Sequence, residues 1–354
     1  MQSLWRSSAV GAVLTLVAGA ASAQTSRHNV TGDSIAIYNL VGDVRIEGGT
    51  GKAVTVEVTR QGRDAGQLKV ESGPIRGRES LRVIYPEDDI VMPTSGGGWW
   101  NTQLRVREDG TFGDGGRGYP RTGRSIHIKS RGDGVEASAN LRITVPRGQT
   151  IAVYVGVGRA AISNVDGKLR VDVASADVTA ERTKGELDID TGSGEVTVTD
   201  AEGDVSLETG SGNVAATRVR GTNLNIDSGS GEVNATDVEA TDVNVETGSG
   251  GVDLRNTKAK VLRVETGSGD VQVRLLAPCD EIDIETGSGS VTLAVPDGLS
   301  AQVEIETGSG GIDLGFPVSV RRLESDHVIG TIGEGKGRLK IDTGSGSIRL
   351  IKAS

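Results

Sequence analysis

The sequence predicts an all-β fold: a single-stranded β-solenoid, similar to a parallel β-helix, with two strands in each coil of 18–21 residues. Three observations predict it. A glycine-rich tetrapeptide recurs at nearly constant spacing, apolar and polar residues alternate on both sides of it, and 53 of the 354 residues are glycine while only 3% are aromatic. A fixed period with one supersecondary unit per repeat is typical of a solenoid. Alternation with period two is typical of half-buried strands.

Residues 1–23 have the pattern of a secretory signal peptide. Arg6 supplies a positive charge, residues 9–18 form a short apolar stretch, and Ala21-Ser22-Ala23 resembles a cleavage site. We therefore expect an exported chain, in the periplasm or at the cell surface or outside the cell. The alternative is an uncleaved anchor, for which the apolar stretch is short. No later segment has the length and hydropathy of a transmembrane segment.

Residues 24–150 predict an N-terminal β region and cap that includes an insertion at residues 86–124. Alternating patterns predict its strands, at residues 34–48, 53–59, 80–85, 125–129 and 139–145. The insertion is rich in glycine, aromatic and charged residues and shows little periodicity. Because an uncovered solenoid end can pair with other chains, we expect this region to cover the N-terminal end. Self-association is expected through solenoid edges that stay open.

Residues 151–354 predict the repeat solenoid. The tetrapeptides Thr/Ser-Gly-Ser-Gly begin at Thr191, Thr209, Ser228, Thr247, Thr266, Thr286, Thr307 and Thr343. The first seven follow one another at intervals of 18–21 residues, but the last follows after 36, which predicts one degenerate coil around residues 315–337. Strands of successive coils are expected to pair at ~4.8 Å, so about ten to eleven coils would form a rod roughly 50 Å long.

The charge and the reactive residues exclude several classes of function. The formal net charge of −10 argues against nucleic acid as a partner, because such binding depends on neutralising phosphates. The single cysteine, Cys279, cannot form an intramolecular disulfide, and His28, His127 and His327 are too scattered in sequence to suggest a metal cluster. The Gly-Ser-Gly turns lack the strand-to-helix elbow and the phased histidine of a serine nucleophile.

An acidic residue precedes every one of the eight tetrapeptides. These residues are Asp190, Glu208, Asp227, Glu246, Glu265, Glu285, Glu306 and Asp342. Alternation with inward apolar residues predicts that they point outward and stack at the coil spacing. Such a carboxylate ladder is a candidate site for Ca²⁺, which takes oxygen ligands, and no other cofactor is expected. The alternative is that each carboxylate stays solvated and accepts hydrogen bonds from its own turn.

The hydroxyl groups of the tetrapeptides form a second array. A regular Thr-x-Ser array could contact sugar or ice, but a structural role in the turns is the interpretation we favour. Glycine-dense bends make poor flat platforms, and Ser and Thr readily hydrogen-bond nearby backbone.

The insertion concentrates aromatic and arginine residues. Aromatic and arginine side chains are typical of surface patches that recognise a partner. The candidate residues are Tyr85, Trp99, Trp100, Arg105, Arg107, Phe112 and Tyr119. The alternative interpretation is that the rings cover the end of the solenoid as part of a cap.

Three segments carry a resemblance to a known family. They are Asn140-Leu141-Arg142-Ile143-Thr144-Val145-Pro146-Arg147-Gly148, the successive tetrapeptide coils, and the closing stretches at residues 330–337 and 343–350. In these the chain resembles the bacterial putative-adhesin family, exported β-strand-repeat proteins also described as a domain of unknown function, over roughly residues 33–352. The resemblance implies an adhesin-like role and offers no catalytic residues. The insertion departs from the compact N-terminal region usual in the family.

These observations lead us to expect an exported, non-enzymatic β-solenoid that acts as an adhesin-like binding or scaffold protein of the cell envelope or surface. Its partner would be an envelope or surface protein or a polysaccharide. One alternative is a polysaccharide-active enzyme on a β-helix, because paired carboxylates can cleave glycosidic bonds and acidic residues are abundant. Another, which the resemblance allows, is a component of an envelope-stress sensor.

Overall fold

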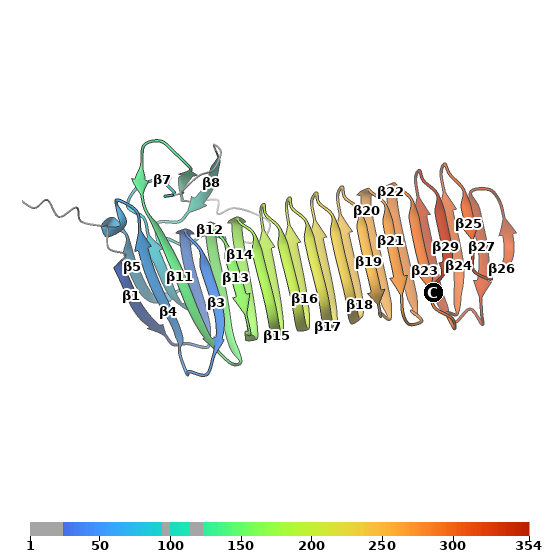
Figure 1. Cartoon of the computed structure of the whole chain (residues 1–354), viewed down its shortest axis with the longest axis horizontal. Helices are drawn as coiled ribbons and strands as arrows, with labels where there is room; N and C mark the ends of the chain where they lie inside the picture. Colours follow the sequence, from blue (N-terminus) through green and yellow to red (C-terminus); the bar gives the residue numbers. More distant parts are fainter. Residues whose placement is uncertain (1–23, 94–99, 114–122, 354) are drawn as a thin grey trace, which may run out of the picture.

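The computed structural model describes residues 24–93, 100–113 and 123–353, and it confirms the all-β solenoid (Figure 1). The N-terminal elements are β1 (Gln24–Val30), β2 (Ser34–Val41), β3 (Val44–Gly49), β4 (Val54–Gln61), the 3₁₀ turn η1 (Ala65–Gln67), β5 (Lys69–Ile75), β6 (Arg78–Ile84), β7 (Asp89–Val91), β8 (Asn101–Val106), β9 (Arg124–Lys129), β10 (Val135–Glu136) and β11 (Ser138–Pro146). Within the described part of the chain no helix could cross a membrane.

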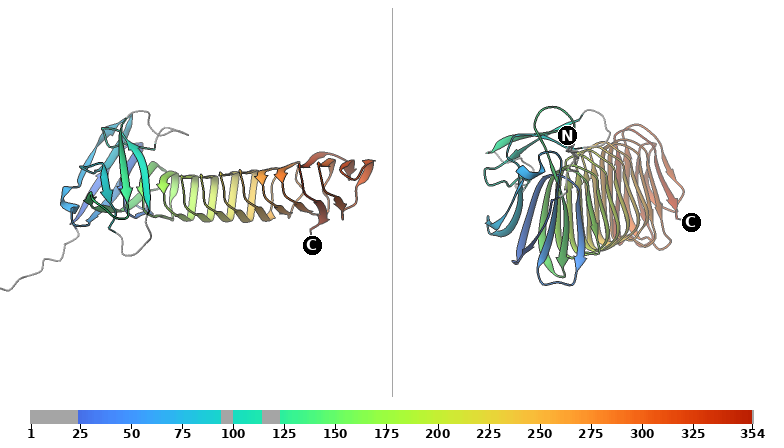
Figure 2. Two further views of the ribbon diagram at one scale, coloured as in Figure 1. Left: turned by 90° about the horizontal axis from the view of Figure 1, so that it is seen from above. Right: turned by 60° about the vertical axis from the view of Figure 1, so that its left-hand side comes forward.

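The remaining strands build the rod seen along its length in Figure 2. They are β12 (Gln149–Val157), β13 (Ala160–Ser163), β14 (Asp166–Ser175), β15 (Val178–Thr191), β16 (Val196–Thr209), β17 (Val214–Ser228), β18 (Val233–Thr247), β19 (Val252–Thr257), β20 (Val261–Ser268), β21 (Val271–Leu275), β22 (Glu281–Ser288), β23 (Val291–Val295), β24 (Ala301–Thr307), β25 (Ile312–Leu314), β26 (Ser319–Leu323), β27 (His327–Ile332), β28 (Gly337–Thr343) and β29 (Ile348–Lys352).

Each coil contributes one segment to each of two facing sheets. Sheet I contains the segments that precede the tetrapeptide turn, and sheet II contains those that follow it. Neighbouring coils pair in parallel and in register, so that Leu187 of β15 lies beside Val205 of β16 in sheet I, and Val178 lies beside Val196 in sheet II. The inward residues of both sheets are buried and form one continuous core. The predicted alternation therefore places the core correctly.

The second bend of each coil is a corner at which four long strands, β15 to β18, change direction without ending. In six successive coils one residue takes the left-handed backbone conformation here, with φ between 53° and 58°, although none is glycine: Asn164, Arg182, Asp200, Arg218, Asp237 and Asn256. Their side chains stack along the corner and bond between coils. Arg218 Nε donates to Asp200 Oδ1 over 2.6 Å, and Asn256 Nδ2 donates to Asp237 Oδ1 over 2.9 Å. These bonds offset part of the backbone strain.

At the N-terminal end, two neighbouring coils are separated by about a hundred residues of sequence. The first coil consists of β2 and β3, and β12 and β13 of the second coil pair with them directly. The chain between them extends both sheets outward: β11, β4 and β1 continue sheet II, while β6 and β5 continue sheet I. A separate sheet of order β10-β7-β9-β8 lies in the same region. Both sides of this end are therefore covered.

The C-terminal end differs from the expectation of one degenerate coil at residues 315–337, which is wrong. Most of that segment forms β26 and β27, a hairpin whose strand β27 pairs antiparallel with β24. The last coil in sequence, β28 with β29, instead lies between the coil of β22 and β23 and the coil of β24 and β25. Spatial order and sequence order therefore differ at this end (Figure 1).

Candidate binding surfaces

Two of the described rings of the predicted aromatic patch, Tyr85 and Phe112, are buried and do not lie at the surface. Tyr85 is 1% exposed, and its hydroxyl donates to the carbonyl oxygen of Val41 over 2.9 Å. Burial raises the pKa of this phenol well above its ordinary value. Phe112 is 5% exposed and packs edge-on against Tyr38, with 5.8 Å between the ring centroids. These two rings cannot contact a ligand, because both are buried and contact residues of β2.

The other residues of the predicted patch are distributed differently. Trp100 is half-buried against the core, and Arg105 is exposed on β8. Arg107 is half-buried, and its Nη1 donates to Thr111 Oγ1 over 3.1 Å. Trp99 and Tyr119 lie outside the described residues. The described part of the insertion thus contributes buried packing at Phe112 and one exposed arginine on β8.

A shallow groove opens on the outer side of sheet I, where the N-terminal region meets the rod. Its volume is about 210 Å³, and it is lined by Ser34, Arg78, Thr150, Ile151, Ala152, Lys168, Leu169, Arg170, Glu186 and Asp188. Five strands that are neighbours in sheet I contribute to it: β6, β2, β12, β14 and β15. The small side chains of Ala36 and Ala152 leave room there, in the column where later coils carry charged or polar residues.

The charges of this groove are held in place by their partners. Arg170 Nη1 lies 2.6 Å from Asp188 Oδ2, and Lys168 Nζ lies 3.0 Å from Glu186 Oε2. Arg78 Nη1 donates to the hydroxyl of Tyr154 over 3.2 Å. Tyr154 in turn stacks on Tyr38 at 4.6 Å with nearly parallel rings. The groove therefore presents guanidinium, ammonium, carboxylate and hydroxyl groups on the outer side of sheet I.

The acidic residues before the turns form a column on the outer side of sheet I. The pairing of β14 with β15 adds Asp172 to its N-terminal end, and the inserted coil places Asp342 between Glu285 and Glu306. Cations pair with carboxylates of the column near its N-terminal end and at Glu285. Arg170 Nη2 lies 3.5 Å from Asp190 Oδ2, and Lys340 pairs with Glu285. Partial burial raises the pKa of Asp190 despite its arginine partner.

No metal centre is visible in the part of the chain that the structure describes. No three His, Cys, Asp or Glu side chains in it are grouped so that they could hold a metal ion. The carboxylates are stacked one per coil and do not converge on a point. The structure thus gives the Ca²⁺ hypothesis no converging ligand set, and the hypothesis stays a prediction.

The hydroxyl groups of the turns fall into two columns. The first Thr or Ser of each tetrapeptide is buried, and its hydroxyl donates to a backbone carbonyl of the neighbouring coil, as Thr266 does to Gly250 over 3.1 Å. Thr307 donates in the same way to Gly346 over 2.9 Å. This column holds coils together and is not available to a ligand. The serines between the two glycines are more exposed and follow the outer edge of the turns.

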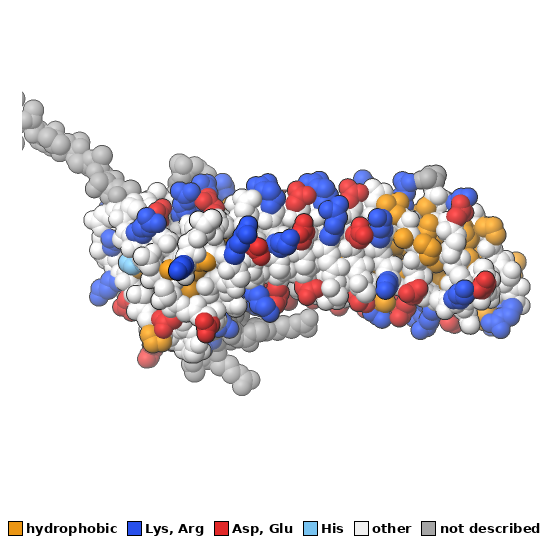
Figure 3. All heavy atoms as spheres, turned by 90° about the horizontal axis from the view of Figure 1, so that it is seen from below, with side chains coloured by type: hydrophobic (Ala, Val, Ile, Leu, Met, Phe, Trp, Pro, Cys, Tyr) orange, Lys and Arg blue, Asp and Glu red, His pale blue; other side chains and the backbone are white. Residues whose placement is uncertain are grey.

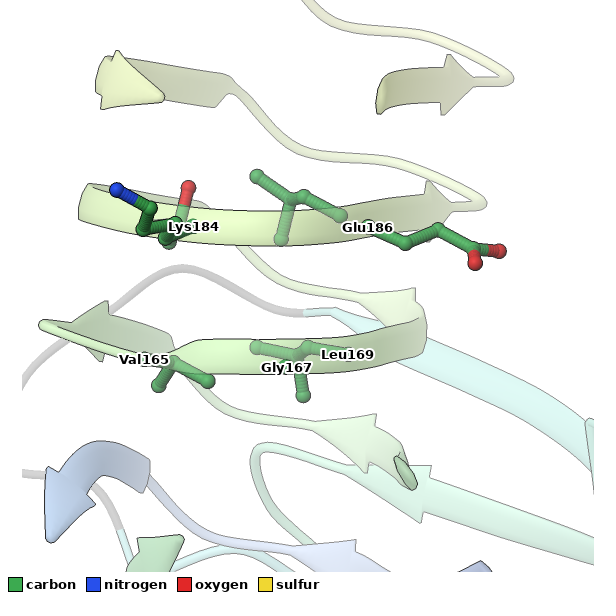
Figure 4. Close-up of a pocket in the computed structure, with 7 residues that line it drawn as sticks. Val165, Gly167, Leu169, Lys184 and Glu186 are labelled. Carbon is green, nitrogen blue, oxygen red and sulfur yellow. The ribbon is translucent and has the colours of Figure 1, made fainter. Parts of the chain in front are cut away.

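Two further hollows lie near the C-terminal half of the rod, and both are open. One of about 380 Å³ lies on sheet II over β19, β21 and β23, and one of about 270 Å³ lies beside β24 and β28. A dimple between β14 and β15 has no room for a water molecule (Figure 4). There Lys184 and Glu186 point away from the core and Leu169 lies on the strand below.

The sole cysteine, Cys279, is buried, and burial raises the pKa of its thiol to about 11.

Sequence comparison gives the chain a family. The model of the family named Toastrack DUF4097 matches residues 129–350, which is more than half of the chain. The chain belongs to the Toastrack DUF4097 family. The match begins at the last residue of β9 and ends within β29, so it includes every coil from β12 onward, whereas β1 to β8, and with them the first coil of β2 and β3, lie outside it.

Curated proteins and solved structures give no further indication of function for this member of the Toastrack DUF4097 family. No curated protein is similar to this chain in sequence. One similar solved structure is that of a "putative cell adhesion protein" from Clostridium sporogenes ATCC 15579, with 10% identity, 94% of this chain and 100% of that chain covered, and a TM-score of 0.23. At that TM-score the two backbones superpose too poorly to support a conclusion about function.

The sequence alone missed the groove on sheet I. Arg78, Arg170 and Tyr154 belong to segments separated by up to about a hundred residues, and the pairing of β2 with β12 brings them together. One signal was present: Tyr154 lies 18 residues before Asp172, which lies 18 before Asp190, so the acidic column could have been extended backward by phase.

Proposed function

We propose that the protein is an exported, non-enzymatic binding or scaffold protein of the cell envelope or surface, adhesin-like in the sense that its rod presents extended faces to a partner. The observation that supports the proposal is the repetitive, open surface of the rod. Side chains of one type recur in columns along the rod, and the hollows of the described region are shallow and open. Such a surface suits a long polymer or a protein more than a small substrate, which is usually enclosed.

The groove on sheet I supports a polysaccharide as the partner. Its arginine, lysine and carboxylate groups can exchange hydrogen bonds with sugar hydroxyls, and ion pairs keep them oriented without a ligand. The groove is open and lies on the outer side of sheet I, so a chain of sugars could enter it and extend along the rod. Figure 3 shows charges of both signs along a different side of the rod, the edge at which the coil corners lie.

A glycan array with purified residues 24–354, read with and without Ca²⁺, tests this proposal. We expect binding to a subset of bacterial surface polysaccharides, and a dependence on Ca²⁺ only if the acidic column takes part. Lys168→Ala should weaken binding by about tenfold, because it removes an ionic hydrogen-bond donor from the groove.

Lys258→Ala is the matched control. Lys258 is also an exposed lysine paired with a glutamate, with Nζ 3.4 Å from Glu239 Oε2, but it lies at a coil corner away from the groove. If the two variants lose binding equally, the groove is not the site. If the wild-type chain binds no polysaccharide on the array, the glycan ligand is ruled out and a protein partner must be sought in the envelope fraction.

A further inference from the structure

The rod is closed on only one side at its C-terminal end. Sheet I continues beyond β24 through β27 and then β26. Sheet II stops at β25, whose described partner is β29 alone. The two strands β26 and β27 therefore form a ledge with no opposing sheet, which we call the C-terminal ledge. The N-terminal end differs, because strands extend both of its sheets.

The inner side of the ledge carries apolar side chains that face solvent. Val320 lies opposite Gly330 and Leu323 lies opposite the fully buried Val328, and a register shift between them keeps both on the core side. Val320 is 40% exposed and Leu323 is 69% exposed. Among the described residues, the other large hydrophobic side chain with such exposure is Leu276, at 45%.

The last strand of sheet II, β25, also has inward apolar side chains that are incompletely buried. Ile312 and Leu314 of β25 occupy the inward positions that Val196 and Val198 hold in β16, yet they are only half-buried, whereas the two valines are fully buried. The outer edge of β25 also leaves backbone groups without a partner strand. Figure 3 shows hydrophobic side chains gathering toward this end of the rod. Phe316 and Val318, in the segment between β25 and β26, pack against part of the core at this end, and the rest of the end stays open at Val320 and Leu323.

We propose that a second copy of this chain completes this end, in a two-fold joint in which β26 of each copy pairs with β25 of the other. Sheet I extends two strands beyond β24, and sheet II ends at β25 with no strands opposite those two. The end is therefore complementary to a second copy of itself. A two-fold axis parallel to the strands and midway between the sheets brings the ledge of one copy to the open edge of sheet II in the other. Such an interface is isologous, as in most homodimers.

The strand directions fit this joint. The chain reverses at each tetrapeptide turn, so sheets I and II run in opposite directions. β27 is antiparallel to β24 and β26 is antiparallel to β27, so β26 runs opposite to β25. A two-fold axis along the strands preserves these directions, and β26 therefore meets β25 of the other copy as an antiparallel neighbour.

The side chains also fit. Val320 and Leu323 of the two copies would face one another and cover Ile312 and Leu314. On the outer side, β26 carries exposed Arg321 and Arg322, while β25 carries the exposed Asp313. In the isolated chain Asp313 Oδ2 lies 3.4 Å from Arg349 Nε. The joint would bring the arginines of β26 beside this carboxylate, which makes the two strand edges complementary in charge.

The oligomeric state of residues 24–354 tests the joint. Light scattering and sedimentation over a concentration series should show the wild-type mass rising to twice that of one chain. Val320→Asp combined with Leu323→Asp should stay monomeric, because carboxylates would be forced into the shared core. Leu276→Asp is the control: it places the same charge on the other exposed hydrophobic residue, away from the ledge, and should dimerise like the wild type.

A charge exchange tests the pairing of the strands independently of the core. Asp313→Arg should raise the dimer dissociation constant by about tenfold, and adding Arg321→Asp with Arg322→Asp should restore it. A wild-type chain that stays monomeric throughout would overturn the proposal and leave the ledge to another partner. A dimer that is unaffected by Val320→Asp with Leu323→Asp would overturn it too, since its interface would lie elsewhere.

Discussion

At the scale of single residues, the tetrapeptide glycines are required by the distance between coils. A Cβ at Gly212 would lie 2.0 Å from the carbonyl oxygen of Gly194 in the neighbouring coil, and Gly212 has φ +146°. Both facts exclude a side chain, because backbone of the next coil cannot move away without breaking sheet pairing. The same closeness recurs along the whole column of turns, so the glycine content of the sequence follows from the coil spacing.

Gly212→Ala should therefore lower the free energy of unfolding by about 2–4 kcal/mol, through left-handed strain and a backbone clash. Thermal and denaturant unfolding measure it. Gly251→Ala is the matched control, since a Cβ there would meet only the Asp270 carbonyl oxygen, at 3.4 Å, and its φ is outside the left-handed region. Equal effects of the two substitutions would contradict this account of the turns.

The corner residues allow a pH prediction. The hydrogen bond from Arg218 holds the pKa of Asp200 below its ordinary value. A carboxyl with a lowered folded-state pKa stabilises the fold above its unfolded pKa, and this contribution is lost as the pH falls through the folded value. Below about pH 4 the corner should therefore lose stability.

Arg218→Asn removes the charge but keeps a residue that tolerates φ > 0, as Asn164 and Asn256 do at the same corner. We expect the pKa of Asp200 to rise toward its ordinary value, as measured by NMR titration of its carboxyl carbon. An unchanged titration would show that the arginine does not set it. Asp253, which pairs with Arg255 in its own coil, serves as an internal reference.

At the scale of elements, periodicity predicted the strands, the turns and the inward residues correctly. Those features depend on local pattern and on alternation between core and solvent. The order of the last coils does not. β28 and β29 carry the same pattern as every other coil, so the sequence cannot show that they lie between β22 and β24. The 36-residue gap between the last two tetrapeptides led us to predict a degenerate coil, and the structure contains a hairpin there instead.

The inserted coil predicts an unusual response to truncation. A chain that ends at Lys336 lacks β28 and β29, so β24 and β25 lose the parallel strands that join them to the rod. Hydrogen exchange should then show lost protection in Ala301–Thr307 and Ile312–Leu314, while Val196–Thr209 stays protected. Protected amides in β24 and β25 would mean that they dock directly on β22 and β23, contrary to the observed order.

At the scale of the whole molecule, the sequence predicted the rod but only part of the surface. The acidic column follows from one position of the repeat, and the sequence shows an acidic residue at that position in every coil with a tetrapeptide. The groove on sheet I could not be predicted from the sequence, because β6, β2 and β12 meet only after the N-terminal segment has folded back. The aromatic patch was misjudged at Tyr85 and Phe112 for a physical reason: composition identifies rings that bury area, but does not distinguish a ring packed on the rod from one left for a ligand.

The central claim is that the rod acts by binding and not by catalysis. The most direct measurement follows a polysaccharide selected by the array through prolonged incubation with residues 24–354, recording both the binding isotherm and the polymer's size distribution. The account predicts saturable binding that Lys168→Ala weakens and a polymer of unchanged length. A polymer that becomes shorter in the presence of the purified chain would contradict it and would favour an enzyme on a β-helix.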